Sequence, residues 1–268
     1  MKPKKVSLLI STYNSPDYLR LSLKSVLFQT RLPDEIVIAD DGSGESTRDV
    51  IESFRAISRV PVKHIWHPDE GFRLAAIRNK AIAEISGDYI IQIDGDIILH
   101  PEFIADHMRF CRKGYFAGGT RAFINQTYSS IILKSKKFTY PGLRQHLGKS
   151  RKAFRSPIIS IALCRILHMD PYKTGGCNMA YWKSDAISIN GYNEDMTGWG
   201  CEDSEFAIRL HNSGVKKLTI RYSAIEFHIE HPDNSRSKYS DNSDMVSKAI
   251  TQKLTYIPNG IVKARNHQ

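Results

Sequence analysis

The sequence predicts an α/β fold with a mostly parallel central sheet flanked by helices. Short apolar runs alternate four times with longer segments whose apolar residues recur at helical spacing. The short runs are apolar on both faces, as strands are in a parallel sheet that helices cover on each side. With 268 residues, of which 41% are hydrophobic, the chain is long enough to bury one substantial core.

The strands are expected where apolar runs stop at polar turns. A short apolar run bounded by turn residues is typical of a buried strand. The expected strands are Val6–Ile10, Glu35–Ala39, Val62–Trp66 and Tyr89–Ile93.

The helices are expected between these strands. Asp17–Gln29 carries apolar residues at the spacing of one helix face, and Arg73–Ile85 is rich in alanine and other helix formers. Ser46–Ile57 begins with a serine that can act as the N-cap. A further helix opens at Pro101, because proline is well tolerated at the first helical position.

Polar side chains gather where three of the expected strands end. Ligands bind at the carboxyl ends of the strands in such sheets. These ends read Ser11-Thr12-Tyr13-Asn14, Asp40-Asp41-Gly42-Ser43 and Asp94-Gly95-Asp96. No G-x-G-x-x-G follows the first strand and G-x-x-x-x-G-K-[ST] is absent, so the dinucleotide-binding and P-loop classes lose their main support.

Asp94 and Asp96 are candidates for holding a metal ion. Two carboxylates that are two residues apart can converge on one hard cation, and Gly95 lets the backbone bend between them. A cation held in this way would bind a diphosphate. A bare D-x-D is more often a plain acidic turn, and that alternative stays open.

The Asp40-Asp41 turn is a candidate nucleoside site. A carboxylate at a strand end can accept hydrogen bonds from a base N–H and a ribose hydroxyl, and Tyr13 beside it could stack on a base. The dipeptides DG and GS are also common in turns, so a simple turn is the alternative.

Basic side chains follow the third expected strand and a late apolar stretch. Arg73 lies at the start of its helix, where the guanidinium could reach a phosphate, although Arg78, Asn79 and Arg73 could equally form a solvated helix face. His228 and His231 close a late apolar stretch. A lone histidine is usually structural, but two at this spacing after a strand suggest a metal ligand.

Residues 198–203, which read GWGCED, are poor material for a helix or a strand. The flanking glycines would let a loop expose Trp199, and sugars stack on exposed indole faces. Glu202 and Asp203 begin a helix that ends at Gly214, so backbone N–H groups favour their ionised forms. The alternative is a structural loop with a helix cap.

The charge of the protein is concentrated in one insert. Residues 121–173 hold 11 Lys and Arg and one acid, Asp170, which gives 11 − 1 = +10, the whole net charge of the chain. The apolar run Ile158–Cys164 lies in this insert, and a basic segment beside an apolar one suits an anionic membrane surface. The neighbouring bases are Lys149, Arg151, Lys152 and Arg155.

Two alternatives to membrane contact stay open for the insert. Its apolar residues could complete the core, or its bases could hold an acidic acceptor in solution. Positive charge alone is weak evidence for nucleic acid, so no nucleic-acid partner is expected.

The sequence also favours a cytoplasmic location. The four cysteines form no CxxC pair, as expected of a reduced protein. The apolar run near the N-terminus is too short for a signal peptide, and no stretch approaches the length of a membrane span. We therefore expect a cytoplasmic protein that is peripheral on the inner face of the cell membrane.

Four stretches taken together resemble family 2 glycosyltransferases with the GT-A fold. In order they are VSLLISTYN, IVIADDGS, GFRLAAIRNKAI and GDYIIQIDGDIILHP. The later stretch KTGGCNMAYWKSDAISINGYNEDMTGWGCEDSEFAIRLHNSG resembles the C-terminal catalytic part of galactosyltransferase-like and chondroitin-polymerase-like enzymes. Together these resemblances cover about residues 5–120 and 174–231.

The resemblance implies one transferase domain over residues 1–232. Its parts would be a nucleotide-sugar-binding half (1–120), the basic insert (121–173) and an acceptor and catalytic half (174–232). Residues 233–268 form a polar C-terminal tail, expected to be loosely attached from Asp241 onward.

The resemblance also implies roles for single residues. The expected donor contacts are Ser11, Tyr13, Asp40, Asp41, Arg73, Asn79, Asp94 and Gly95. The expected ligands of Mn²⁺, or less well Mg²⁺, are Asp94, Asp96 and His228, with His231 as the alternative to His228. Asp203 would be the general base, and Glu202 and Trp199 would contact the acceptor.

The function implied is a metal-dependent, inverting transfer of a sugar from a nucleotide-sugar, with UDP favoured, to a glycan or lipid-linked glycan. Synthesis of a bacterial-type surface polysaccharide or lipopolysaccharide would use such an enzyme. A nucleotidyltransferase is a second hypothesis, but ISTYNSPDYL lacks the Gly-rich, Lys- or Arg-bearing loop that it predicts. A degenerate binding module is a third, and the intact acids and histidine argue against it.

Overall fold

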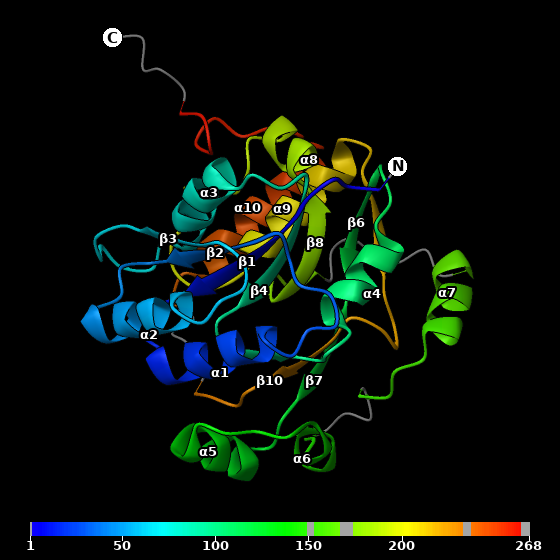
Figure 1. Cartoon of the computed structure of the whole chain (residues 1–268). Helices are drawn as coiled ribbons and strands as arrows, with labels where there is room; N and C mark the ends of the chain where they lie inside the picture. Colours follow the sequence, from blue (N-terminus) through cyan, green and yellow to red (C-terminus); the bar gives the residue numbers. More distant parts are fainter. Residues whose placement is uncertain (1, 149–152, 167–173, 233–236, 264–268) are drawn as a thin grey trace.

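The computed structural model describes residues 2–148, 153–166, 174–232 and 237–263, apart from the side chains of Arg165 and Ile166. In that part of the chain a seven-stranded sheet runs in the order β3-β2-β1-β4-β8-β6-β9 (Figure 1). Its strands are β1 (Val6–Thr12), β2 (Glu35–Asp40), β3 (Val62–Trp66), β4 (Tyr89–Asp94), β6 (Tyr115–Gly118), β8 (Asn178–Trp182) and β9 (Lys216–Thr219).

Most neighbouring strands of this sheet are parallel. β1 pairs in parallel with β2 and β4, β2 with β3, and β6 with β9. Only β8 runs the other way, antiparallel to both β4 and β6. The predicted α/β fold with a mostly parallel sheet is confirmed, and the expected strands β1 to β4 all form.

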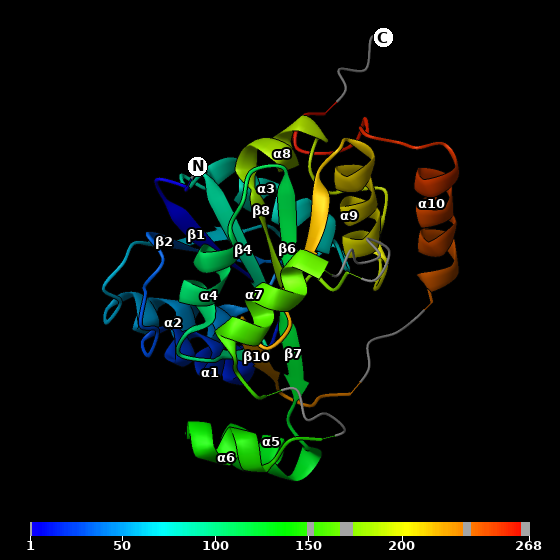
Figure 2. The same ribbon diagram turned by 90° about the vertical axis from the view of Figure 1, so that its right-hand side faces the viewer.

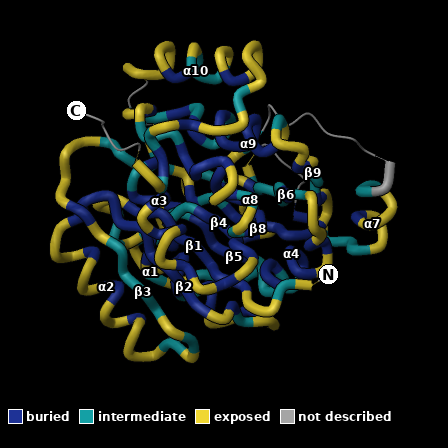
Figure 3. The backbone as a smooth tube through the Cα atoms, turned by 90° about the horizontal axis from the view of Figure 1, so that it is seen from above, coloured by how far each residue is buried: buried dark blue, intermediate teal, exposed yellow. Residues whose placement is uncertain are grey.

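Helices cover both faces of the sheet because successive strand residues point to opposite sides. Leu8 and Ile10 pack in one core with α1 (Pro16–Val26), α2 (Glu45–Arg55) and α4 (Phe103–Phe110). Leu9, between them, packs in the other core with α3 (Leu74–Glu84), α8 (Lys183–Ser188) and α9 (Glu202–Asn212). Figure 3 shows the buried strands between these layers.

All four expected helix starts differ from the observed ones by one or two residues, and α1 begins at Pro16 where Asp17 was expected. α2 begins at Glu45, and its N-cap is Gly44, whose backbone is extended. The expected N-cap at Ser46 is therefore wrong, because Ser46 already lies inside the helix. α4 begins at Phe103, after Pro101, and Arg73 is the residue that precedes α3. Helix termini are decided by single residues, which apolar spacing does not locate.

A second, smaller sheet lies beside the carboxyl ends of the large one. It has the order β5-β10-β7, formed by β5 (Ile97–Leu99), β7 (Thr120–Phe123) and β10 (Ile225–His228). β10 is antiparallel to β5, and its His228 pairs with Ile97, the residue after Asp96. This pairing brings the late histidines to the end of β4.

The basic insert contributes helices α5 (Gln126–Ser135), α6 (Tyr140–Gln145) and α7 (Pro157–Ile166). Ile132 and Leu143 form a small core with Phe227 of β10, so α5 and α6 pack beyond the small sheet (Figure 2). α7 instead leaves Ile158 82% exposed. Among the described residues no helix is both long and apolar enough to cross a membrane.

The C-terminal segment is packed, contrary to the expected loose tail. Helix α10 (Tyr239–Thr251) lies along α9 (Figure 2). The Asn212 amide of α9 donates to the carbonyls of Ala249 and Leu254 at 3.0 and 2.8 Å. Beyond the helix, the Asn190 amide donates to the carbonyls of Ile257 and Val262. Hydrogen bonds from these asparagine side chains hold the polar C-terminal segment in place. The spacing of apolar residues in the sequence does not indicate such contacts.

Candidate active site

The candidate site lies where β1, β2 and β4 end and where α3 and α9 begin. Ser11 lies at the end of β1, Asp94 ends β4, and Glu202 and Asp203 open α9. Arg78, one turn into α3, lies among these residues.

Arg78 is the central contact of this site. Its guanidinium is fully buried and donates from Nε to Ser11 Oγ at 3.0 Å and from Nη2 to Asp94 Oδ1 at 3.0 Å. Its Nη1 donates to Asp203 Oδ1 at 2.9 Å and lies 3.5 Å from Glu202 Oε1. Burial alone would lower the pKa of Arg78, but the surrounding acids raise it well above its usual value, so Arg78 is a cation.

Two carboxyl groups beside Arg78 hold protons more tightly than usual. Burial raises the pKa of Asp94 to about 6, against the opposing charge of Arg78. Burial, and next the charge of Asp203, raise the pKa of Glu202 to about 7. Glu202 Oε2 is buried without a hydrogen-bond partner in the described part of the chain. Both groups therefore titrate close to neutral pH, as groups of active sites often do.

One carboxylate oxygen of Asp203 accepts two hydrogen bonds, and the other accepts none from the residues that the structure describes. Its Oδ1 accepts from Arg78 and, at 3.2 Å, from the hydroxyl of Tyr192. No described residue donates to its Oδ2. Gly176 faces the carboxylate so closely that a Cβ at that position would collide with it. A glycine is therefore needed at position 176 to leave room for the Asp203 side chain.

Asp96 meets two histidines. Asp96 Oδ2 lies 2.9 Å from His231 Nε2 and 3.6 Å from His228 Nε2. One possible ligand atom from each of the three residues can be chosen so that all lie within 4.8 Å of one another. Asp96 Oδ1 and His228 Nδ1 are buried with no hydrogen-bond partner among the described residues.

The residues of this cluster fit a divalent cation. Two imidazoles and a carboxylate suit manganese better than magnesium. A hydrogen bond that His231 donates to Asp96 raises the pKa of His231 to about 9, so the imidazole holds a proton at neutral pH. A divalent cation would replace that proton. The structure thus places both predicted histidines beside Asp96, whereas the Asp94 carboxylate contacts Arg78.

The two aspartates of the predicted nucleoside turn are buried and already hydrogen-bonded. Asp40 accepts from the Ser43 backbone N–H and contacts His64 Nε2 at 2.9 Å. Asp41 contacts His67 Nε2 at 2.6 Å and accepts from the Arg73 backbone N–H at 2.8 Å. These contacts fix the two carboxylates in place. A nucleoside would bind to their remaining lone pairs.

Tyr13 is the most open of the predicted donor residues. Its side chain is 45% exposed, and its hydroxyl donates to Asp69 Oδ2 at 2.8 Å. That hydrogen bond orients the ring beside the Asp41 turn. An oriented and exposed ring is suited to stack on a base.

The remaining predicted donor residues contact other parts of the protein. The backbone N–H of Gly95 donates to the Ser11 carbonyl at 2.7 Å. The Arg73 guanidinium donates to the Pro68 carbonyl and pairs with Glu70. Asn79 is buried, and its amide donates to the Tyr192 carbonyl at 2.8 Å. Asn79 therefore positions the loop that carries Tyr192, whose hydroxyl donates to Asp203.

Trp199 is half-buried, whereas the sequence suggested an exposed ring. It stacks on Tyr239 of α10, with ring centroids 6.3 Å apart and an angle of 25° between the rings. The expected freedom of the glycines is present, since Gly198 and Gly200 both have positive φ angles. Helix α10, which the sequence did not predict, covers one side of this loop.

The role of Arg78 was missed although a signal for it exists. Ala75, Arg78 and Ile82 are spaced to share one helix face, and all three are buried. An arginine on the buried face of a helix needs acidic partners. Tyr192 carried no comparable signal, because its place beside Asp203 depends on tertiary packing.

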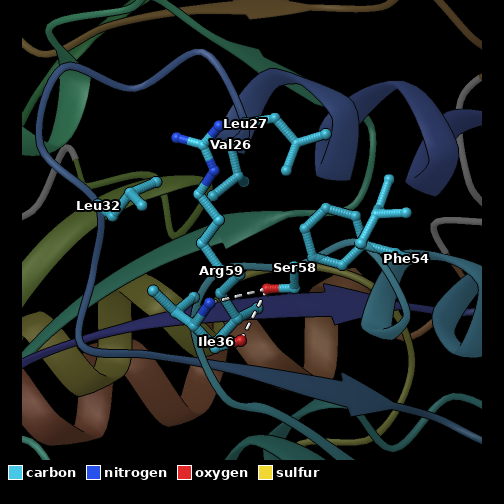
Figure 4. A pocket seen from close by; sticks show the side chains of 9 residues that line it. Val26, Leu27, Leu32, Ile36, Phe54, Ser58 and Arg59 are labelled. Atoms are coloured by element: carbon cyan, nitrogen blue, oxygen red, sulfur yellow. Dashed lines mark hydrogen bonds between the residues drawn. The ribbon is translucent and has the colours of Figure 1, made fainter.

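A pocket elsewhere in the molecule is not part of this site. It has a volume of about 160 Å³ and lies near the start of β2, between the ends of α1 and α2 (Figure 4). Leu27, Leu32 and Phe54 are among its apolar lining residues. The Ser58 hydroxyl is hydrogen-bonded to the backbone carbonyl and N–H of Val60. The acidic residues described above lie at the opposite end of the strands.

Replacing Arg78 tests whether it holds the site together. Arg78→Met leaves Asp94, Asp203 and Glu202 without their shared cation, so we expect the free energy of unfolding to fall by on the order of 3 kcal/mol. Thermal and urea unfolding measure this change. Arg73→Met is the control, since that more exposed ion pair contributes about 1 kcal/mol or less. Equal stability of the two variants would contradict a central role for Arg78.

Two family comparisons match most of the chain. Residues 7–174 match Glycosyl transferase family 2, and residues 160–240 match the N-terminal domain of galactosyltransferase. The first match covers more than half of the chain. The chain belongs to glycosyl transferase family 2. This membership is the one that the four N-terminal motifs implied.

One curated relative is similar over almost the whole chain. A chondroitin synthase of Escherichia coli is 24% identical over 264 residues, which are 93% of this chain and 38% of that protein. The chain therefore spans well under half the length of this relative.

The solved structures show the same fold. S. aureus TarS 1–349 in complex with UDP has a TM-score of 0.62 at 16% identity, over 92% of this chain and 65% of that one. The mannosyltransferase PcManGT from Pyrobaculum calidifontis, in complex with GDP-Man and Mn²⁺, has a TM-score of 0.62 at 14% identity, over 94% and 65%. These likenesses confirm the GT-A type of fold for this family 2 chain.

Proposed function

We propose that this family 2 domain transfers a sugar from a nucleotide-sugar, in particular a UDP-sugar, to a hydroxyl of a glycan acceptor. One observation carries the proposal: a buried arginine joins a carboxylate that keeps one oxygen without a hydrogen bond from any described residue to Asp94, which lies two residues before a candidate cation ligand. Asp203 Oδ2 is that oxygen, and Asp96 is that candidate ligand. A glycosyl transfer needs a base for the acceptor and a positive charge for the leaving diphosphate.

Asp203 is proposed as the general base. Its Oδ2 takes the proton of the acceptor hydroxyl while that oxygen forms a bond to the anomeric carbon. The bond between the anomeric carbon and the diphosphate oxygen breaks, and its electron pair leaves with the nucleoside diphosphate. Because base and leaving group lie on opposite faces of the sugar, one displacement inverts the anomeric carbon. Arg78 and Tyr192 hold Asp203 Oδ1, which would leave Oδ2 for the proton of the acceptor.

The donor side of the proposal rests on the cation cluster and the strand ends. Asp96, His228 and His231 would hold a divalent cation, with Asp94 as a further ligand once it exchanges its contact with Arg78. That cation would neutralise negative charge on the leaving diphosphate. Tyr13, Asp40, Asp41 and Ser11 would bind the nucleoside. The UDP and GDP-Man complexes of the structural neighbours support a nucleoside diphosphate donor.

A screen of nucleotide-sugars tests this function. With Mn²⁺ present, slow hydrolysis of one donor should release its nucleoside diphosphate even without an acceptor, and we expect that donor to be a UDP-sugar. The products also separate the alternative activity, because a nucleotidyltransferase releases pyrophosphate from a nucleoside triphosphate and a sugar phosphate. Absence of hydrolysis for every donor, together with absence of transfer to glycans, would overturn the proposal.

The acceptor is proposed to be a glycan or lipid-linked glycan of a bacterial-type surface polysaccharide, with the domain on the cytoplasmic face of the membrane. The exposed side chains of α7 and its surroundings support contact with a membrane surface. Phe154, Ile158, Ile159 and Ile161 are 39–82% exposed. Of the predicted bases, Arg155 is paired with the buried Asp106 at 2.7 Å, and Lys149, Arg151 and Lys152 lie outside the described residues.

Vesicle co-sedimentation tests the membrane contact. We expect binding to vesicles with anionic lipid, weaker binding at high salt, and a loss of about tenfold or more in Ile158→Asn, because each buried aliphatic side chain contributes roughly 1.5–3 kcal/mol. Ile187→Asn on α8 is the matched control, since Ile187 is 48% exposed away from the insert. Protein that stays in the supernatant with anionic vesicles at low salt would refute membrane binding and leave the transferase proposal intact.

A further inference from the structure

The loop of residues 197–201 has a backbone that needs support. Gly198, Gly200 and Cys201 all have positive φ angles, of 76°, 106° and 74°. For Cys201 this conformation is strained, and strained residues persist only where surrounding contacts hold them. Cys201 directly precedes Glu202, so the support of this loop also positions the carboxyl groups of the site.

Helix α10 supplies that support. The buried Asn242 amide donates to the Gly200 carbonyl at 2.9 Å and to the Thr197 carbonyl at 3.3 Å. Gly198 packs so closely on Lys238 that a Cβ there would lie 2.8 Å from the lysine side chain. One side of the loop is thus fixed by the helix, and its other side is held by the hydrogen bond from the Gly198 N–H to the Phe72 carbonyl.

Two aromatic rings result from this packing. Tyr239, at the start of α10, stacks on Trp199 with an angle of 25° between the rings, and it stays 46% exposed. Both rings lie close to the start of α9, where Glu202 Oε2 is buried without a hydrogen-bond partner in the described part of the chain. The exposed Tyr239 ring thus offers an apolar face beside the loop that Glu202 follows.

We propose that Tyr239 is an acceptor-binding residue and that, with Trp199, it forms a two-ring platform for a sugar of the acceptor. A sugar ring has an apolar C–H face that packs on aromatic rings and hydroxyls that need polar partners. The Glu202 carboxyl group would bond one of these hydroxyls. Asn242 is a positioning residue, because it acts on the platform through the loop.

This inference rests on the proposed transferase function, and its test separates the two. The donor identified by hydrolysis is used with Mn²⁺ and the full chain. The acceptor probes are the p-nitrophenyl glycosides of glucose, galactose, N-acetylglucosamine and N-acetylgalactosamine. Tyr239→Ala should raise the acceptor KM about tenfold and leave donor KM and donor hydrolysis unchanged. Tyr239→Phe should keep the wild-type acceptor KM, since the ring face makes the contact.

Two further variants distinguish binding from packing. Tyr256→Ala removes a ring that is 54% exposed beyond α10, and we expect no effect on the acceptor KM. Asn242→Ala should raise the acceptor KM and also lower kcat, because Cys201 and Glu202 lose the support of the loop. An unchanged acceptor KM in Tyr239→Ala would overturn the inference. So would donor hydrolysis that no glycoside increases, although the donor half of the proposed function would then stand. Absence of hydrolysis and transfer in the wild type would remove both.

Discussion

Replacing Asp203 with asparagine is expected to lower turnover by two to four orders of magnitude, roughly the contribution of a general base. Asparagine keeps the shape of the side chain, and its amide oxygen can still accept from Arg78 and Tyr192. It cannot take a proton from the acceptor. Because the residue acts on the acceptor, donor affinity should stay nearly unchanged. Steady-state kinetics with both substrates varied, and a donor titration, measure the two effects separately.

Two comparisons sharpen this result. Glu202→Gln changes the neighbouring carboxyl group, whose pKa of about 7 would also suit a base. If Glu202→Gln were the inactive variant and Asp203→Asn nearly normal, the base would be Glu202. Asp195→Asn is the control for a carboxylate on a nearby loop, where its side chain accepts from Asn259. That variant should keep the wild-type kcat.

Removal of the metal is the second large effect that we expect. EDTA should abolish activity, and Mn²⁺ should restore it better than Mg²⁺, because two of the candidate ligands are imidazoles. Asp96→Ala should lose Mn²⁺ binding and donor binding together, since Asp96 supplies the carboxylate that meets both histidines. Calorimetric titration with Mn²⁺ measures the first loss without any substrate.

Matched variants separate the ligands in the same titration. His211→Ala removes an exposed histidine of α9 and should leave Mn²⁺ affinity unchanged. Asp94→Asn tests the predicted ligand that lies outside the cluster: weaker Mn²⁺ binding would make Asp94 a ligand, whereas unchanged binding would leave it only as the partner of Arg78. Full activity in EDTA would refute the metal assignment as a whole.

Four strands of the large sheet, β1 to β4, could be predicted because they carry their own signal, whereas β6, β8 and β9 were not predicted. Val6–Ile10 and Tyr89–Ile93 are apolar on both faces and end in polar turns, and these features locate β1 and β4. The small sheet could not be predicted in the same way. β5 has three residues and β7 has four, so their pairing depends on contacts distant in the sequence.

The acids of the site could be found for a similar reason, while their partners could not. The strand-end rule places Asp94 and Asp96 at one edge, and their roles stay predictions until tested. An arginine on a helix usually lies on the face that contacts solvent, so Arg78 was not predicted as a partner of the acids. Its spacing from Ala75 and Ile82 nevertheless indicates the buried face of α3. Trp199 was expected to be exposed because α10, whose Tyr239 stacks on it, was not predicted. The buried residues of α10 are Asn242 and Ala249, so the sequence of this helix is too polar to be recognised as packed.

The hydrogen bonds from Asn242 to the loop before Glu202 have a consequence for protein engineering. A recombinant fragment cut after residue 232, close to where the resemblance to catalytic motifs stops, would omit the helix that shapes this loop. Chimeras that graft this domain onto another scaffold should therefore keep the chain through residue 263. Libraries that aim to change the acceptor could diversify positions 238 and 239, which lie against the loop but outside the GWGCED stretch.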